Sequence, residues 1–523
     1  MTGDRWVGFG PVLRLVLRRD RVLLATWVAV MALLAIGLVP SVRIGYPTPQ
    51  ALAAFAASAM ANPAELALRG PIFQASVGGL EAWTLASSGS LVNAVVGILL
   101  AVRNTRTEEH TGRTELLRSA PVGRFTPPAV AVVAPGLAAL VLGLVTFLGL
   151  VVEQLPAAGA AVLGGILAAN AILFVAVGVL AAQVTASPGA ARALAFVLLG
   201  AAFAVAVMGD LTHSALVWAS PFGWARHAAA FAYDRGWALL LPVVTTIVVL
   251  VVVAVIARDR DLGGALVRPR PARSTAAAWF ASPLALAWRR QRGALVGWAL
   301  GLGVLGLLIG SVTGSLSAQL DTPAFHAFAQ RVAGGISVGR AFFLFILYVL
   351  AQVATAAALA AVLQLRSDEA AGLAETLLAT PVGRPRWVLA QTVVAVAVGA
   401  GVITGIGLGG AASSGDWGVL LLGLGYLPAV VLMVGLAVAL IGWAPRAAVA
   451  VSWAVLGLVM LVDLLGEFGL VATSAMNVSP FALLFNGLVG SLSWPLAAVG
   501  LAAAGVLLTW LGTVGIRRRD LRP

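Results

Sequence analysis

The chain of 523 residues contains no cysteine and no lysine, and only 10% of its residues are charged. The absence of cysteine excludes disulfide bonds, thiolate metal sites and a cysteine nucleophile. The absence of lysine excludes an ordinary P-loop ATPase domain, because the lysine of the GxxxxGKS/T motif contacts the β- and γ-phosphates of the nucleotide. If ATP drives this protein, the ATPase therefore lies on another polypeptide.

Histidine is also scarce, and the 4 histidines are scattered at His110, His213, His227 and His326. No HxxxH or HExxH pair is present, so the sequence predicts no metal site. We also find no His, Asp and Ser side chains that would converge at one depth of a membrane. The sequence therefore predicts a protein that is not an enzyme.

Hydrophobic residues make up 61% of the chain, and the mean hydropathy is +1.01. A soluble globular protein carries roughly 45–50% apolar residues and about 25% charged residues. Apolar runs near 20 residues long are typical of membrane-spanning helices, and about twelve of them are present. They lie at Val22–Val39, Trp83–Val102, Ala129–Val152, Ala158–Val184, Arg192–Gly209, Trp237–Ala257, Ala294–Thr313, Ala341–Leu363, Val388–Gly409, Gly418–Trp443, Ala447–Leu465 and Pro495–Ile516. The sequence therefore predicts an all-α polytopic membrane protein.

The distribution of arginine predicts the orientation of these spans. With both termini in the cytoplasm, 27 of the 33 arginines fall in cytoplasmic segments. Such an excess of basic residues marks the cytoplasmic side of a membrane protein. Ahead of the first span, apolar residues alternate with Arg14, Arg18, Arg19 and Arg21 at helical spacing. This pattern predicts an amphipathic helix in the membrane interface; the alternative is an ordinary basic flank of the first span.

The chain is an internal repeat. Residues 106–124 align without gaps to residues 366–384, and nine of the 19 positions are identical. Further matches pair Arg18, Arg19, Arg21 and Trp27 with Arg289, Arg290, Arg292 and Trp298, Ser220-Pro-Phe222 with Ser479-Pro-Phe481, and Arg260-Asp-Leu262 with Arg519-Asp-Leu521. We therefore expect two parallel six-helix repeats, with a first repeat at 1–258, an Arg/Pro-rich cytoplasmic linker at 259–278 and a second repeat at 279–523. A pseudo-twofold axis along the membrane normal would place a pathway between them.

The repeated element RxxExxGxxExL…PVGR lies between the second and third predicted spans of each half. Its charged residues are three apart, which predicts one slowly drifting stripe along a short helix. Glycine within it would allow close backbone approach, and the Pro-Val-Gly sequence would end the helix. The candidate residues for coupling to a partner are Arg106, Glu109, Gly112, Glu115, Pro121, Arg124, Arg366, Glu369, Gly372, Glu375, Pro381 and Arg384. The alternative is that these charges only set topology, but topology requires no repeated acidic residues.

At these residues the chain resembles the permeases of type-2 ABC exporters, in the fused two-repeat form of the polyketide-antibiotic and multidrug exporters. The resemblance implies a permease subunit that moves hydrophobic or amphipathic small molecules out of the cytoplasm, across the inner membrane of a bacterium. It implies a separately encoded ATPase in two copies, which binds ATP and magnesium and contacts the repeated acidic helix. Membrane lipid is the other expected partner, and no nucleic acid or cofactor is expected on this chain. Because Leu373 and Ala370 replace Arg113 and His110 in the second copy, we expect unequal coupling.

Polar and aromatic residues within the spans, together with the two Ser-Pro-Phe segments, are the candidates for a substrate pathway. They are Ser88, Asn93, Phe222, Phe345, Tyr348, Gln352, Thr355 and Phe481. Packing and hydrogen bonding between helices explain the same residues equally well. Proline favours the first turn of a helix, so Pro221 and Pro480 each predict a short helix in an outer loop. The resemblance implies that such helices are re-entrant; the alternative is ordinary loop structure. We interpret the nearby His213, His227 and Asp234 as surface polar residues.

An ion-coupled secondary transporter built from two repeats is the alternative function. Such transporters usually bury ionisable residues near the middle of the membrane. Here the acidic residues lie at span ends or in loops, at Glu81, Glu153, Asp210, Asp463 and Glu467. The sequence therefore favours the exporter permease.

Overall fold

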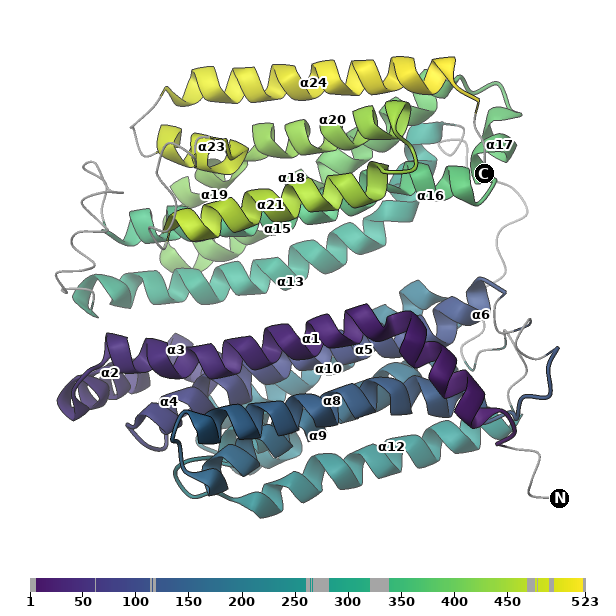
Figure 1. The fold of residues 1–523 in the computed structure, drawn as a ribbon. Helices are drawn as coiled ribbons and strands as arrows, with labels where there is room; N and C mark the ends of the chain where they lie inside the picture. The colour runs from purple at the N-terminus through teal and green to yellow at the C-terminus, as the bar shows by residue number, and fades with distance from the viewer. Residues whose placement is uncertain are drawn as a thin grey trace. The chain divides into compact units, whose positions relative to one another are not determined.

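The computed structural model describes residues 6–61, 63–112, 115, 119–259, 264, 266, 282–319, 338–467, 476, 478–488 and 493–520. Every regular element in this part of the chain is helical, which confirms the predicted all-α class. The chain divides into two compact units, Met1–Ala272 and Arg273–Pro523. The boundary falls within the expected linker at 259–278; the bounds of the two repeats stay a prediction. Each unit is a helical bundle (Figure 1).

The first unit is built around one buried helix, α9. Its elements are α1 (Phe9–Gly45), α2 (Pro49–Ala61), α3 (Pro63–Arg69), α4 (Val77–Thr84), α5 (Ser90–Val102), α6 (Glu108–His110), α8 (Thr126–Val152), α9 (Ala157–Val184), α10 (Pro188–Leu211), α11 (Pro221–His227) and α12 (Leu240–Asp259). Helix α9 packs against α5, α8, α10 and α12. Because neighbours surround it on several sides, its sequence is apolar or small on nearly every face.

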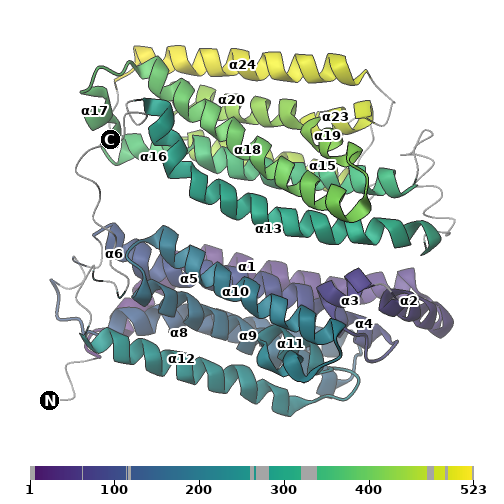
Figure 2. The ribbon, with the colours of Figure 1, turned by 180° about the vertical axis from the view of Figure 1, so that it is seen from behind.

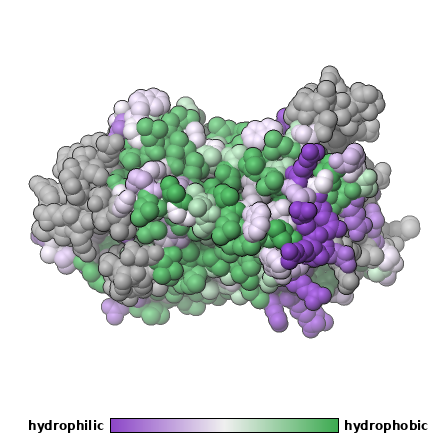
Figure 3. Space-filling model, turned by 90° about the horizontal axis from the view of Figure 1, so that it is seen from above, coloured by the Kyte–Doolittle hydropathy of each residue, from purple (hydrophilic) through white to green (hydrophobic). Residues whose placement is uncertain are grey.

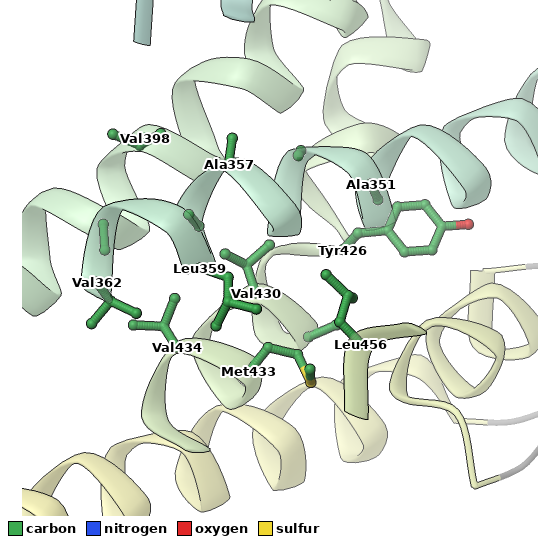
Figure 4. Packing of buried hydrophobic residues seen from close by; sticks show 14 of the residues in the cluster. Ala351, Ala357, Leu359, Val362, Val398, Tyr426, Val430, Met433, Val434 and Leu456 are labelled. Carbon is green, nitrogen blue, oxygen red and sulfur yellow. The ribbon is translucent and has the colours of Figure 1, made fainter. Parts of the chain in front are cut away.

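The second unit repeats this plan with its own core. Its elements are α13 (Pro283–Gln319), α15 (Val338–Val362), α16 (Gln364–Ala370), α17 (Leu373–Leu378), α18 (Arg384–Ser414), α19 (Gly418–Leu424), α20 (Leu427–Trp443), α21 (Ala448–Glu467), α23 (Pro480–Leu488) and α24 (Trp494–Arg518). Leu359, Val430 and Val434 interlock where α15 meets α20 (Figure 4). On the other side of α20, Gly442 faces the backbone of Gly512 in α24. Such small residues let membrane helices pack backbone to backbone.

Ten of the helices in the described residues are long and apolar enough to cross a membrane. Helices α13 and α21 lie at the two remaining predicted spans, and the count of twelve stays a prediction. Figure 3 shows a broad hydrophobic band with hydrophilic residues gathered at one end. These features and the composition establish a multi-pass membrane protein.

Helix α1 joins the predicted interfacial helix and the predicted first span into one element of 37 residues. At 1.5 Å per residue it is about 55 Å long, well beyond the roughly 30 Å of hydrocarbon in a bilayer. Figure 1 shows that α1 bends, so that its N-terminal turns point in a different direction from the rest of the helix. The structure also contains two helices, α2 and α3, between the first two predicted spans, where the sequence predicted no helix.

Candidate functional site

The repeated element follows α5 in the first unit and α15 in the second, at the arginine-rich end of each bundle. The chain leaves α5 through a π-helical turn, Arg103–Thr107, and α6 ends at His110. In the second unit α16 and α17 are separate short helices on either side of Gly372. The prediction of one continuous helical stripe was therefore wrong, because a glycine interrupts the helix in both copies.

The two glycines serve a different purpose from the one predicted. Gly112 has φ +74° and Gly372 has φ +70°, in the left-handed region that other residues rarely adopt. A Cβ added at either position would meet no atom within 4 Å. Close backbone approach is therefore not the reason for glycine here. The reason is a sharp turn that lets the chain reverse at the surface of the bundle.

Arg106 turns inward instead of facing a partner. It is 1% exposed, which makes it the most buried of the described charged residues of the first copy. Its Nε donates to the Thr185 carbonyl at 2.7 Å and its Nη2 to the Gly264 carbonyl at 2.6 Å, while Nη1 pairs with Glu109. Arg106 therefore ties the repeated element to the end of α9 and to the chain that follows α12. Arg106 lies within the π-helical turn Arg103–Thr107, and such turns are frequent at functional positions of helices.

In the second copy the acidic residue takes the buried position. Glu369 is 3% exposed and pairs with Arg366 at 3.2 Å and with Arg519. Arg519 follows α24, just as the aligned Arg260 follows α12; Arg260 lies outside the described residues. Arg384 donates to the Arg519 carbonyl at 2.8 Å and to the Ile516 carbonyl at 3.2 Å. Each copy thus binds the chain that follows the last helix of its unit, Gly264 after α12 and Arg519 after α24, but through different side chains.

An ion pair that the sequence reasoning missed recurs in both copies. Arg19 in α1 pairs with Glu108 at 2.8 Å. The aligned Arg290 in α13 pairs with Asp368 through two hydrogen bonds of 2.6 and 2.8 Å. The sequence contains a signal for these ion pairs. Both acidic residues are adjacent to the first glutamate of the motif, and both arginines belong to the basic segment that matches between the two halves. The first helix of each unit is therefore bonded to the repeated element.

The start of α1 is fastened to the same element at a second point. The Val7 carbonyl accepts hydrogen bonds from the Gly123 amide at 2.9 Å and from the Thr126 hydroxyl at 3.0 Å. The Trp6 and Phe125 rings are 5.8 Å apart. The predicted interfacial segment is thus bonded directly to the Pro-Val-Gly-Arg turn in the first unit.

Exposure separates the candidate coupling residues into two groups. Arg106 and Glu369 are buried and hold the element in place, with Glu109, Arg366 and Arg384 partly covered beside them. Glu115, Pro121, Arg124, Glu375 and Pro381 are exposed. Glu115 and Glu375 are therefore the acidic residues of the motif that are exposed at the surface, and their coupling role stays a prediction. Within the described residues, no group of three or more side chains could hold a metal ion, and the buried charged groups of the element form ion pairs.

A second polar cluster lies at the opposite end of the first unit. Arg226 in α11 is buried, pairs with Asp210 at 2.6 Å and donates to the Leu68 carbonyl at 2.8 Å. Burial lowers the pKa of Arg226, whereas the hydrogen bond to Asp210 raises it. The His227 Nε2 lies 2.8 Å from the other Asp210 oxygen, so the prediction of a surface histidine was wrong for His227. His213 is exposed, and the Asp234 carboxylate accepts a hydrogen bond from the Phe231 amide.

The two helices predicted from the Ser-Pro-Phe segments are confirmed. Helix α11 begins at Pro221 and α23 at Pro480, and the preceding Ser220 and Ser479 each cap the new helix. Ser479 also donates to Asp463 at 2.8 Å. Figure 2 shows α11 against the end of α9 and α10. Whether these helices are re-entrant stays a prediction.

Most of the pathway candidates are packed inside their own unit. The Asn93 side chain accepts a hydrogen bond from the Trp27 indole at 2.9 Å, and Gln352 donates to Asp463 at 2.8 Å. Ring contacts and hydrogen bonds within each unit hold others, namely Phe222 with Phe174, Tyr348 with Phe485, and Thr355 with the Ala351 carbonyl. Phe481 is fully buried, Ser88 is half-buried, and the side chain of Phe345 lies outside the described part. These contacts fit the interpretation as helix packing; the pathway role stays a prediction.

Two comparisons with known proteins identify relatives. A family model described as "Multidrug efflux system permease Rv1217c, C-terminal domain" matches residues 280–517. The chain is also 36% identical to the multidrug efflux system permease protein Rv1217c of Mycobacterium tuberculosis, over 99% of this chain and 96% of the relative. The likeness therefore spans both units and both copies of the repeated element.

Proposed function

The chain belongs to the family of multidrug efflux system permeases, and from this membership we propose that it is the membrane-spanning subunit of an ATP-driven exporter of hydrophobic or amphipathic small molecules. The ATPase is a separate polypeptide, in two copies, which binds ATP and magnesium. The lack of any lysine supports this, because the chain has no ordinary P-loop. The arginine-rich end faces the cytoplasm of a bacterium, with both termini on that side.

The observation that carries this proposal is the pair of repeated elements held by equivalent ion pairs. Arg19–Glu108 and Arg290–Asp368 join each element to the first helix of its unit. Closure of two ATPase subunits on ATP would displace the elements, and these ion pairs would pass the displacement to α1 and α13. Contiguous packed and ion-paired elements are the physical basis for such coupling.

The copies are expected to respond unequally. In the first, Arg106 holds two backbone carbonyls. In the second, Glu369 pairs with Arg519, and Arg384 rather than the arginine of the motif's first position bonds the backbone carbonyls. Salt screens a buried pair little, and the Glu369 carboxylate is buried, as Arg106 is in its own ion pair with Glu109 in the first copy. The expected inequality therefore lies in which side chain anchors the element, namely Arg106 in the first copy and Glu369 in the second.

The proposal is tested by reversing the exposed charges, Glu115→Arg with Glu375→Arg, in the permease co-expressed with the ATPase encoded beside it. Because both side chains are exposed, the variant should fold and insert normally. We expect ATPase co-purification and drug efflux to fall at least tenfold. The matched control is Asp520→Arg, an exposed acidic residue at the same end but outside the two elements.

Two results would contradict the proposal. One is unchanged efflux in the double variant with no ATPase bound to the parent protein. The other is efflux by the chain alone, driven by a proton gradient, which would favour the ion-coupled transporter.

A further inference from the structure

A shallow groove of about 420 Å³ runs along one face of the N-terminal part of α1. It is lined by Gly10, Leu13, Arg14, Leu17, Arg18 and Arg21. These positions follow the spacing of three and four residues that places side chains on one face of a helix. The groove therefore belongs to a single amphipathic stripe, at the arginine-rich end of the first unit.

The three arginines of the groove are exposed, and none of them makes a hydrogen bond or ion pair with the part of the chain that the structure describes. Their neighbour Arg19, on another face of α1, behaves differently, because it is bonded to Asp20 and Glu108. Arg14, Arg18 and Arg21 are thus a concentration of three positive charges within two turns. Like charges at this spacing repel one another, so the groove favours an anionic occupant.

The position of the groove selects the kind of anion. The stripe ends at Arg21, and the long apolar part of α1 begins at Val22, which is 70% exposed on the surface of the protein. The groove is therefore at the level where a bilayer changes from hydrocarbon to headgroups. Leu13 and Leu17 are half-buried and give the groove an apolar floor between the guanidinium groups.

We propose that this groove binds the phosphate headgroup of an anionic phospholipid. The arginines pair with the phosphate oxygens, and Leu13 and Leu17 contact the glycerol end of the acyl chains. A free phosphate ion would meet only the arginines in an open groove, where water competes, whereas a lipid is concentrated there by the bilayer. This inference goes beyond the proposed function, because it depends only on the placement of α1 at a membrane surface.

Lipid in the groove would also steady the repeated element of the first copy. Arg18 is adjacent to Arg19, which bonds Glu108, and the helix start is fastened to Gly123 through Val7. A bound headgroup restrains the same two turns of α1 from the other side. In the second unit, Ala285 stands in place of Arg14 in the aligned segment, so one of the three arginines of the stripe has no counterpart there.

The test is native mass spectrometry of the purified full chain titrated with phosphatidylglycerol or phosphatidylcholine. The variant carries Arg14→Gln, Arg18→Gln and Arg21→Gln. The control carries Arg192→Gln, Arg386→Gln and Arg446→Gln, which removes the same charge from exposed residues outside the groove. Each arginine at an anionic surface contributes about fivefold in affinity, so three predict a loss of roughly 100-fold for phosphatidylglycerol.

We expect that loss in the groove variant only, with phosphatidylcholine bound equally weakly by all three proteins. A charge-keeping variant, Arg14→Lys with Arg18→Lys and Arg21→Lys, should retain most of the binding and shows that loss does not come from misfolding. Equal phosphatidylglycerol affinity in the parent and the groove variant would overturn the proposal. So would an equal loss in the control, or displacement of the lipid by millimolar inorganic phosphate, which would indicate a small-anion site.

Discussion

The Arg290–Asp368 ion pair gives the sharpest prediction about how the repeated element is held. The Asp368 side chain is 8% exposed and that of Arg290 is 38% exposed, so one partner is buried and the other is partly in water. Arg290→Gln would leave the carboxylate with one weaker donor, the Gln364 amide at 3.3 Å. The variant therefore keeps the buried negative charge of Asp368 and removes the positive charge and most of the hydrogen bonds that stabilise it.

The magnitude follows from that intermediate burial. Breaking an exposed pair costs about 0–1 kcal/mol and breaking a fully buried pair about 3–5 kcal/mol. We therefore expect Arg290→Gln to lower the free energy of unfolding by about 2 kcal/mol, near 30-fold in the equilibrium constant. Asp368→Asn should cost less, because it leaves no buried charge behind. The double variant should cost less than the sum, with a coupling energy of about 1–2 kcal/mol.

The assay is reversible unfolding of the four proteins of this cycle in mixed micelles, followed by drug efflux from cells. A matched cycle at Arg19 and Glu108 should give a smaller coupling energy between the two residues, because Arg19 also bonds Asp20 and Asn104. A coupling energy near zero in the second unit, or a larger one in the first, would refute the reasoning. So would normal efflux in Arg290→Gln despite the expected loss of stability, since the pair is proposed to transmit movement.

Three further predictions concern turns, packing and the polar cluster at the opposite end. Gly372→Ala should lower the free energy of unfolding by about 1–2 kcal/mol, because an alanine at φ +70° is strained. Gly372→Asn should lower it less, and thermal melting of both variants measures the difference. Gly442→Ala should lower the free energy of unfolding by about 1–3 kcal/mol, because the added methyl group forces α20 away from α24. The control Gly457→Ala, where a Cβ on α21 meets no neighbouring atom, should leave the stability unchanged or raise it. Arg226→Gln should lower the free energy of unfolding by about 3 kcal/mol, because it leaves the buried Asp210 carboxylate with His227 as its remaining partner. Adding Asp210→Asn should recover part of that loss, and full stability in the single variant would contradict the ion pair.

Hydropathy and repetition predicted much of the architecture. Long apolar runs leave few alternatives to membrane helices, so the ten strongest helices fall at predicted spans. The Ser-Pro-Phe segments also predicted α11 and α23, because the preference of proline for the first turn of a helix is a local signal. The helices α2 and α3 were missed, since their alanine-rich sequence is shorter than a span and carries no clear period.

The repeated element was located from sequence, but its geometry was not predicted. A spacing of three residues indicates a helix, yet it does not reveal that Gly112 and Gly372 break that helix with positive φ. Nor does it reveal that Arg106 and Glu369 face inward. Their partners are backbone carbonyls and a distant arginine, and such contacts depend on tertiary packing rather than on local pattern. The motif therefore combines buried residues that anchor the element with residues that are exposed, and the sequence alone does not distinguish the two kinds.

Site-specific crosslinking would test the central claim most directly. Because the chain has no cysteine, Glu115→Cys and Glu375→Cys each introduce a unique reactive thiol without any background substitution. We predict that both variants crosslink to the separate ATPase in membranes, with yields that change when ATP binds, and that His213→Cys, exposed at the opposite end, does not. No crosslink from either element, or an equal yield from His213→Cys, would contradict the account.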